Sequence, residues 1–157
     1  MGKEHRYTLT LDWVGNRGTG TDTYRSYDRN YVISADGKPE IVGSSDPAFL
    51  GDPTRWNPEE LLLASVAACH KLWYLHLCTT RSIIVTRYSD QPSGIMIEEP
   101  NGAGQFKKVT LHPTVEITAG DPDVAQQLHG EVGAMCFIAR SVNFPIHHQA
   151  TVALVET

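Results

Sequence analysis

Residues 57–77 read NPEELLLASVAACHKLWYLHL and predict one long helix. Asn57 suits the N-cap, Pro58 the first helical position and Glu60 the third position of a capping box. The 17 residues that follow, 61–77, are apolar on almost every face. A helix of this kind is covered by the rest of its domain or by a partner subunit, so we expect it to be central to the fold.

Strand patterns lie on both sides of this helix. The predicted strands cover residues 6–14, 82–88, 94–99, 105–118 and 148–155. A second helix is predicted over residues 121–140, because Asp121 and Pro122 repeat the cap-then-proline pattern and apolar residues follow along one broad face. Strands that are grouped before each helix favour an α+β fold, with antiparallel-rich sheets and two central helices, over a doubly wound parallel sheet.

Length and composition indicate one globular domain over residues 1–157. The chain has 41% hydrophobic residues and a net charge of −5, from 13 Lys and Arg against 18 Asp and Glu. This composition excludes a wholly disordered chain, and the absence of a basic run argues against nucleic acid or an anionic membrane as partner. The N-terminal residues carry no apolar stretch of signal-peptide length, and His70, Lys71 and His76 interrupt the apolar helix. We therefore expect a cytoplasmic protein.

The chain has three cysteines, Cys69, Cys78 and Cys136, and no Cys-x-x-Cys pair. This pattern argues against a disulfide framework and against a zinc site, and no metal is expected. Cys69 and Cys78 are nine residues apart and point to opposite sides of one helix, so only Cys136 could pair with Cys69. The ordinary interpretation is that all three pack as small apolar side chains, as we expect for Cys78.

A redox role for Cys69 requires its thiolate, because a free thiol with a pKa of about 8.5 is mostly protonated at neutral pH. A nearby arginine could lower that pKa, since its guanidinium stays charged and can bridge a thiolate and a carboxylate. From the residues alone, four arginines are equal candidates: Arg17, Arg25, Arg29 and Arg55. Glu59 is an available acid, although the helix dipole alone favours an acid in a first turn.

The histidines are weaker candidates. His70 follows Cys69 directly, but adjacent helix positions do not face each other, so we leave it out of the predicted catalytic set. His147 and His148 would point to opposite faces of a strand, which argues against a metal-binding pair.

Three segments together resemble the OsmC/Ohr family of thiol-dependent peroxidases. They are NPEELL with Glu59 ten positions before Cys69, the upstream WVGNRGTG at residues 13–20, and AMCFIA around Cys136. The second cysteine follows the first by 67 residues, and the resemblance runs from the first predicted strand to the last. The sequence is more similar to the OsmC and OsmC-like branches than to the Ohr branch proper.

This resemblance implies a function and a set of roles. Cys69 would be the peroxidatic cysteine, Cys136 the resolving cysteine, Arg17 the residue that holds the thiolate, and Glu59 the acid that orients the arginine. The implied fold is an intertwined homodimer in which each site draws on both subunits. The implied activity reduces organic hydroperoxides with a dithiol or lipoyl-type reductant and uses no metal or prosthetic group.

Two other functions stay open. One is a small-molecule binding or stress-associated protein with this fold but little peroxidase activity, and the other is a structural dimer with packing cysteines. Phe137 follows Cys136 where the family more often has proline, and the polar pair His70 and Lys71 follows Cys69. These departures keep the binding function open.

Overall fold

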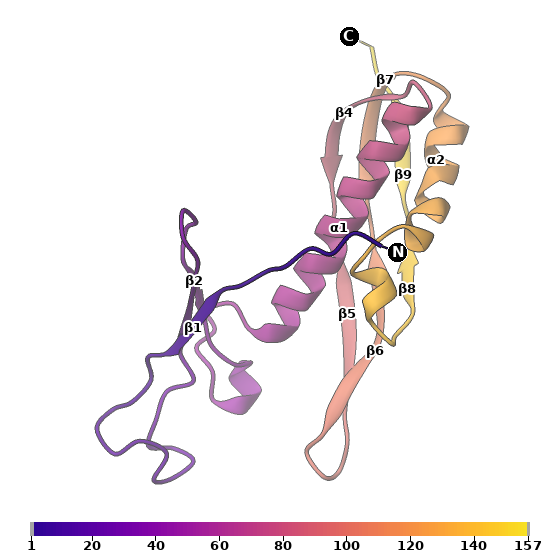
Figure 1. The fold of residues 1–157 in the computed structure, drawn as a ribbon. Coiled ribbons are helices and arrows are strands. Elements are labelled where there is room, and N and C mark those ends of the chain that lie inside the picture. The colour runs from indigo at the N-terminus through magenta and orange to yellow at the C-terminus, as the bar shows by residue number, and fades with distance from the viewer. Residues whose placement is uncertain (1, 157) are drawn as a thin grey trace. The chain divides into compact units, whose positions relative to one another are not determined.

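The computed structural model describes residues 2–156 and divides the chain into two compact units, Met1–Leu61 and Leu62–Thr157. The first unit contains a three-stranded antiparallel sheet in the order β1-β2-β3 (Figure 1). Its strands are β1 (Thr10–Trp13), β2 (Tyr31–Ser34) and β3 (Ile41–Gly43), and a 3₁₀ turn follows at Pro47–Phe49. The first strand is therefore shorter than the predicted strand 6–14.

A glycine fixes the path of the chain after β1. A Cβ atom on Gly15 would lie 1.9 Å from the backbone oxygen of Asp28, which only glycine avoids. Asp28 N donates to Gly15 O at 2.8 Å, and Trp13 Nε1 donates to Asp28 O at 2.8 Å. This close approach holds together the two ends of the connection between β1 and β2.

The first unit has no apolar interior. Within residues 2–61 the buried polar residues are Ser44 and Asn57, and every buried apolar side chain of the described chain belongs to the second unit. Trp56 is 57% exposed and Leu11, in the middle of β1, is 57% exposed. Such a small sheet is not stable alone, because it buries too little apolar surface to offset the ordering of its strands.

Helix α1 (Pro58–Thr80) confirms the predicted start signal. Asn57 Oδ1 accepts from Glu60 N at 2.8 Å, and Glu60 Oε2 accepts from Asn57 N at 3.1 Å, which is the reciprocal pattern of a capping box. Glu60 takes the capping role, as predicted, and this leaves the Glu59 carboxylate out of the cap.

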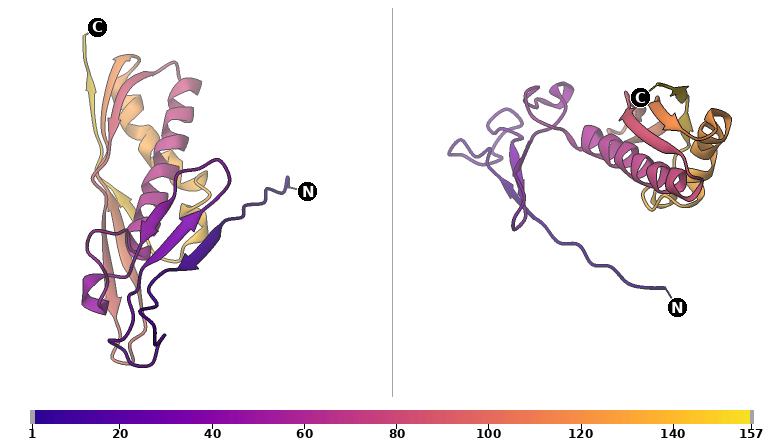
Figure 2. Two further views of the ribbon diagram at one scale, coloured as in Figure 1. Left: turned by 90° about the vertical axis from the view of Figure 1, so that its left-hand side faces the viewer. Right: turned by 90° about the horizontal axis from the view of Figure 1, so that it is seen from above.

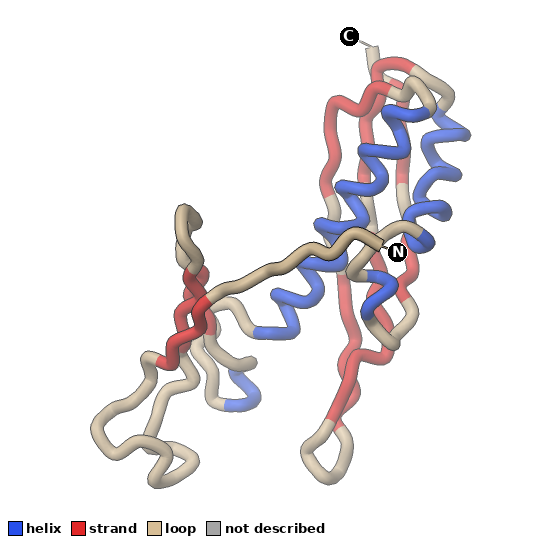
Figure 3. Tube along the Cα trace, viewed as in Figure 1, coloured by secondary structure: helices blue, strands red, loops and turns tan. Residues whose placement is uncertain are grey.

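The strands of the second unit form two mixed sheets (Figure 3). They are β4 (Ile84–Ser89), β5 (Ser93–Glu98), β6 (Gly104–Leu111), β7 (Thr114–Ala119), β8 (Ile146–His148) and β9 (Thr151–Leu154). One sheet has the order β4-β7-β9 and the other β5-β6-β8. The β4–β7 and β5–β6 pairs are antiparallel, whereas the β7–β9 and β6–β8 pairs are parallel. The α+β class is confirmed, with sheets that are mixed.

Proline divides the strand predicted over residues 105–118. Pro113 has no N–H to donate to a ladder, and β6 ends at Leu111 while β7 begins at Thr114. The pairing continues across the break, because Gln149 N donates to Leu111 O and Thr151 N donates to Pro113 O, both at 2.8 Å. The last predicted strand is divided at the matching point, between β8 and β9.

The second helix is shorter than predicted. Helix α2 spans Pro122–Glu131, and its cap is Asp121, whose side chain accepts from Asp123 N at 2.8 Å. Two 3₁₀ turns follow, Val132–Ala134 and Ala139–Ser141. Gly130 and Gly133 have low helix propensity and lie where the α-helix ends. Cys136 therefore lies between the two turns rather than on the second helix.

The main core of the second unit lies between both helices and β7. Tyr74 and Cys78 from α1 meet Val115 and Ile117 from β7 and Leu128 from α2. Figures 1 and 2 show α1 and α2 lying next to the β4-β7-β9 sheet. Cys78 is buried in this core, in agreement with its predicted packing role.

The second unit buries one face of α1 and leaves other apolar positions uncovered. The buried residues are spaced four apart, at Val66, His70, Tyr74 and Cys78, whereas Leu72 is 61% exposed. Within residues 2–156, α1 is the one helix that is long and apolar enough to cross a membrane by length and composition alone. The core helix of a soluble protein has the same properties, and α1 packs in a core.

Candidate active site

Two of the predicted site residues, Cys69 and Cys136, are brought together in the second unit. Cys69 is half-buried on α1 and packs against the main core, of which the buried Cys136 is a member. Both are free thiols. Cys136 is held by its backbone, since its N–H donates to Val132 O at 2.8 Å and its Sγ accepts from Ala139 N at 3.4 Å.

The environment keeps Cys136 protonated at neutral pH. Burial raises the pKa of its thiol to about 11, and the neighbouring Cys69 thiol adds to this effect. The thiolate is the nucleophilic form of cysteine, so Cys136 is the poorer initial nucleophile of the pair. Cys69 is the more accessible of the two thiols, and an electrophile reaches it first.

Arg17 and Glu59 belong to the first unit. Arg17 lies in a turn in which Asn16 Oδ1 accepts from Gly18 N at 2.9 Å and from Gly20 N at 3.0 Å. The Arg17 guanidinium donates to the Arg25 carbonyl oxygen, and its Nε lies 3.6 Å from Asp28 Oδ1. The side chain is half exposed, and this pairing leaves part of the guanidinium open to another anion.

Two of the other arginines considered from sequence, Arg29 and Arg55, are also engaged, whereas Arg25 is exposed. The Arg29 guanidinium lies 4.0 Å from the centroid of the Tyr27 ring and donates to the Tyr27 carbonyl oxygen at 2.6 Å. Arg55 pairs with Asp52 at 3.8 Å and donates to Tyr31 O at 3.4 Å. The Glu59 carboxylate makes no hydrogen bond or ion pair within the described residues. Burial is the main cause of the raised pKa of Tyr31, and the Glu59 charge adds to it.

A histidine cluster that the sequence analysis missed lies beside Cys136. The rings of His70 and His129 are stacked with centroids 5.3 Å apart, and His70 Nε2 lies 3.0 Å from His129 Nδ1. His148, from β8, lies 6.0 Å from His70 and 6.1 Å from His129 between ring centroids. Among residues 2–156 no group of His, Cys, Asp and Glu has the geometry of a metal site.

A small cavity lies between the histidine cluster and Cys136. Its volume is about 90 Å³, and it is lined by these three histidines, Cys136, apolar side chains and two glycines. His129 is 1% exposed, and its Nε2 is buried without a hydrogen-bond partner. Burial lowers the pKa of His70 to about 4 and that of His129 to about 3, so both rings are neutral at neutral pH.

These two pKa values predict that stability falls as the pH drops from about 7 to about 5. The unfolded chain, with histidine pKa values near 6.5, binds protons in this range that the folded chain excludes, so protonation favours unfolding. We expect a loss of roughly 2 kcal/mol for each histidine by about pH 5. This loss in the free energy of unfolding is measured by urea unfolding at several pH values. His129→Gln should remove about half of the effect, whereas the exposed His147→Gln should leave it unchanged.

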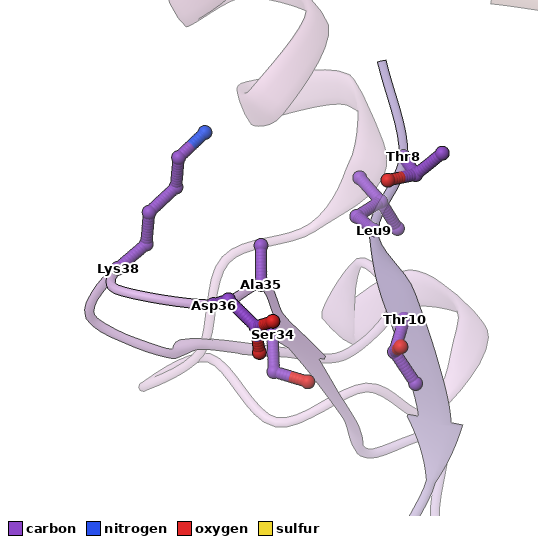
Figure 4. A pocket seen from close by; sticks show the side chains of 7 residues that line it. All are labelled: Thr8, Leu9, Thr10, Ser34, Ala35, Asp36 and Lys38. Atoms are coloured by element: carbon purple, nitrogen blue, oxygen red, sulfur yellow. The ribbon is translucent and has the colours of Figure 1, made fainter.

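A hollow of about 490 Å³ lies in the first unit, and no cysteine lines it. Figure 4 shows it between Thr8, Leu9 and Thr10 on one side and the turn after β2, with Asp36 and Lys38, on the other. It is open and lined mostly by polar side chains and carries no nucleophilic thiol. This hollow is therefore separate from the candidate site around Cys69 and Cys136.

Comparisons with known proteins agree on the fold. An OsmC-like protein of unknown function from Vibrio cholerae is 23% identical, with a TM-score of 0.82 over 94% of this chain and 100% of that chain. An organic hydroperoxide resistance protein OsmC from Legionella pneumophila is 18% identical, with a TM-score of 0.64 over 96% of this chain and 100% of that chain.

A third structure has a molecule in its active site. It is a putative organic hydroperoxide resistance protein from Vibrio cholerae, with captopril bound in one of the active sites. It is 20% identical, with a TM-score of 0.64 over 97% of this chain and 95% of that chain. Comparison with curated protein sequences gave no match. The model of the family described as OsmC-like protein matches residues 51–151, about two thirds of the chain, and the chain therefore belongs to the OsmC-like family.

Proposed function

We propose that this protein is a thiol-dependent peroxidase that reduces organic hydroperoxides to alcohols. The observation that carries the proposal is the pairing of a half-buried thiol, Cys69, with a buried, protonated thiol, Cys136. Membership of the OsmC-like family supports it, because relatives of the same fold include organic hydroperoxide resistance proteins.

The reaction follows from thiol chemistry. The Cys69 thiolate attacks the distal oxygen of the hydroperoxide, the O–O bond breaks, and the alkoxide leaves and takes a proton to become the alcohol. The Cys136 sulfur then attacks the Cys69 sulfenic acid, which forms the disulfide and releases water. A dithiol or lipoyl-type reductant restores both thiols by exchange. In this proposal Arg17 stabilises the thiolate and the charge on the peroxide oxygens, and Glu59 orients Arg17.

The surface beside Cys69 favours a hydrocarbon-bearing substrate. Leu72, Trp73 and His76 lie on the same side of α1 as Cys69, one and two turns further along, and line an open hollow of about 210 Å³. Phe137 is 69% exposed and packs edge-on against Trp73 with ring centroids 5.6 Å apart. Apolar side chains of this kind bind a hydrocarbon group better than they bind hydrogen peroxide.

The test is the loss of free thiols when cumene hydroperoxide is added to the reduced protein. One equivalent should oxidise two thiols per chain and give the Cys69–Cys136 disulfide. If the thiols of the wild-type protein and of a Cys69→Ser chain are oxidised equally slowly, the protein is not a peroxidase. The small-molecule binding function would then fit the protein better than the peroxidase function. The contacts of Arg17 with Arg25 and Asp28 also favour the binding function, because they occupy part of the guanidinium.

We also propose that the protein is an intertwined homodimer located in the cytoplasm. The sheet of the first unit lacks an apolar interior, and the second unit exposes Leu72, Met135 and Phe137. The first unit also exposes apolar side chains, such as Leu11 and Trp56, so both units have apolar surface that is open to water. A second copy of the chain covers these surfaces if the first unit of each chain packs on the second unit of the other. Arg17 and Glu59 of one chain would then complete the site around Cys69 of the other.

Mixing two inactive variants tests the shared site. Arg17→Ala and Cys69→Ser chains are each expected to be inactive, but a mixed dimer has one site that carries both changes and one site that carries neither. Unfolding and refolding an equal mixture should restore about a quarter of the wild-type activity, because half of the dimers are mixed. Recovery of none, with mixed dimers present by native mass spectrometry, would show that Arg17 and Cys69 act within one chain.

A further inference from the structure

We infer that His129, backed by His70, accepts the thiol proton of Cys136 when its sulfur attacks Cys69, directly or through water in the cavity that both residues line. This inference rests on the proposed function for the assignment of Cys136 as the resolving thiol. It assigns a role to the histidine cluster, which takes no part in the peroxidase reaction proposed above.

The need for a base comes from the burial of Cys136. With a pKa of about 11, only about one thiol in ten thousand is ionised at pH 7, and the thiolate is the attacking form. Resolution through the free thiolate would therefore be slow at neutral pH. A group that takes the proton as the S–S bond forms removes this limitation.

His129 is the suitable acceptor among the groups that line the cavity. Its Nδ1 is already hydrogen-bonded to His70 Nε2, while its Nε2 is buried and unpartnered. In the tautomer in which Nδ1–H donates to His70, Nε2 has a lone pair that is free to accept a proton. The cavity of about 90 Å³ has room for water, which could bridge Nε2 and the Cys136 sulfur.

The surroundings fix the imidazole and keep it neutral. The Tyr74 ring stacks on His129 with centroids 3.9 Å apart, and the Tyr74 hydroxyl donates to Ala125 O at 3.1 Å. His148 is the other titratable group that approaches from β8, and no carboxylate, lysine or arginine lines the cavity. The low pKa of the neutral ring means that His129 carries the proton only transiently, at the stage when the negative charge developing on the Cys136 sulfur favours the imidazolium.

The proton balance of the step is complete. The Cys136 S–H bond breaks as the S–S bond to Cys69 forms, and the S–O bond of the sulfenic acid breaks. The proton passes to His129 and from His129 to the departing hydroxide, which leaves as water. No oxidant or reductant beyond the hydroperoxide already consumed is required.

A test that uses no hydroperoxide separates this step from the peroxidase activity. Dithiobis(nitrobenzoate) forms a mixed disulfide with Cys69 and releases one coloured thiolate, and attack by Cys136 then releases a second. The leaving thiolate needs no proton, so the second release measures the activation of Cys136 alone. A Cys136→Ala chain, which lacks the second release, identifies that phase.

With His129 acting as base, the second release should be nearly independent of pH between about pH 6 and about pH 9. In His129→Gln it should be about 10-fold to 100-fold slower near pH 7 and should rise about tenfold per pH unit, because only the free thiolate then reacts. His147→Gln, on the exposed side of β8, should behave as the wild-type chain.

Two results would overturn the inference. One is a wild-type second release that itself rises tenfold per pH unit, a measurement that needs no folded variant. The other is a folded His129→Gln chain with the wild-type rate and profile. A different outcome is a protein that does not consume hydroperoxide but whose second release is independent of pH. That result would support His129 as the base and refute only the peroxidase function.

Discussion

Replacing Cys69 with serine should abolish hydroperoxide reduction, with a loss of at least about 1000-fold in the rate of cumene hydroperoxide consumption. Serine preserves the size of the side chain but has a far higher pKa and does not form the sulfenic acid. Cys136 cannot substitute for it, because burial keeps its thiol protonated and out of reach of a bulky hydroperoxide. The measurement is peroxide consumption in the presence of a dithiol.

The matched control is Cys78→Ala, which also removes one thiol from α1. Cys78 lies in the main core, 1% exposed, so its loss should leave the rate unchanged and should lower the free energy of unfolding by about 1 kcal/mol. If Cys78→Ala instead removed the activity and Cys69→Ser did not, the assignment of the nucleophile would be wrong.

Replacing Cys136 with alanine should separate the two halves of the reaction. The first equivalent of alcohol should form at the wild-type rate, because Cys69 is intact, but turnover with a dithiol should then fall by at least about 100-fold. The sulfenic acid on Cys69 should accumulate and react with a dione that alkylates sulfenic acids, and mass spectrometry detects the product.

Steady turnover of Cys136→Ala at the wild-type rate would contradict this prediction. It would mean that the external thiol attacks the Cys69 sulfenic acid directly and that Cys136 is a packing residue. Ser141 lies on the following 3₁₀ turn, and its hydroxyl donates a hydrogen bond to Phe137 O at 2.6 Å. The Ser141→Ala variant is therefore a control for local structural change, because it leaves both thiols in place.

The parts of the structure that local chemistry determines could be predicted from the sequence. The capping box of Asn57 and Glu60 depends on residues three positions apart, and the helix begins where those residues predict. The closeness of Cys69 and Cys136 could be anticipated as well, since helix geometry excluded Cys78 and the family resemblance pointed to the second cysteine.

Two element boundaries differ from the prediction for reasons that lie within the segments themselves. The strand pattern over residues 105–118 is continuous, and only the missing N–H of Pro113 divides it. The end of α2 was missed because the apolar spacing continues past Gly130 and Gly133 into a segment that adopts 3₁₀ turns.

The histidine cluster was missed for a different reason. His70, His129 and His148 are widely separated in sequence, and alternation along β8 gave no reason to place His148 beside α1. The one available signal was that His70 lies four residues before Tyr74 on the buried face of its helix.

The absence of an apolar interior in the first unit has a consequence for how the protein reaches its native state. Its three strands bury too little hydrocarbon to order on their own, so they acquire structure only when they dock on another surface. If that surface is on a second chain, folding and assembly are one process, and mass action makes the melting temperature rise with protein concentration.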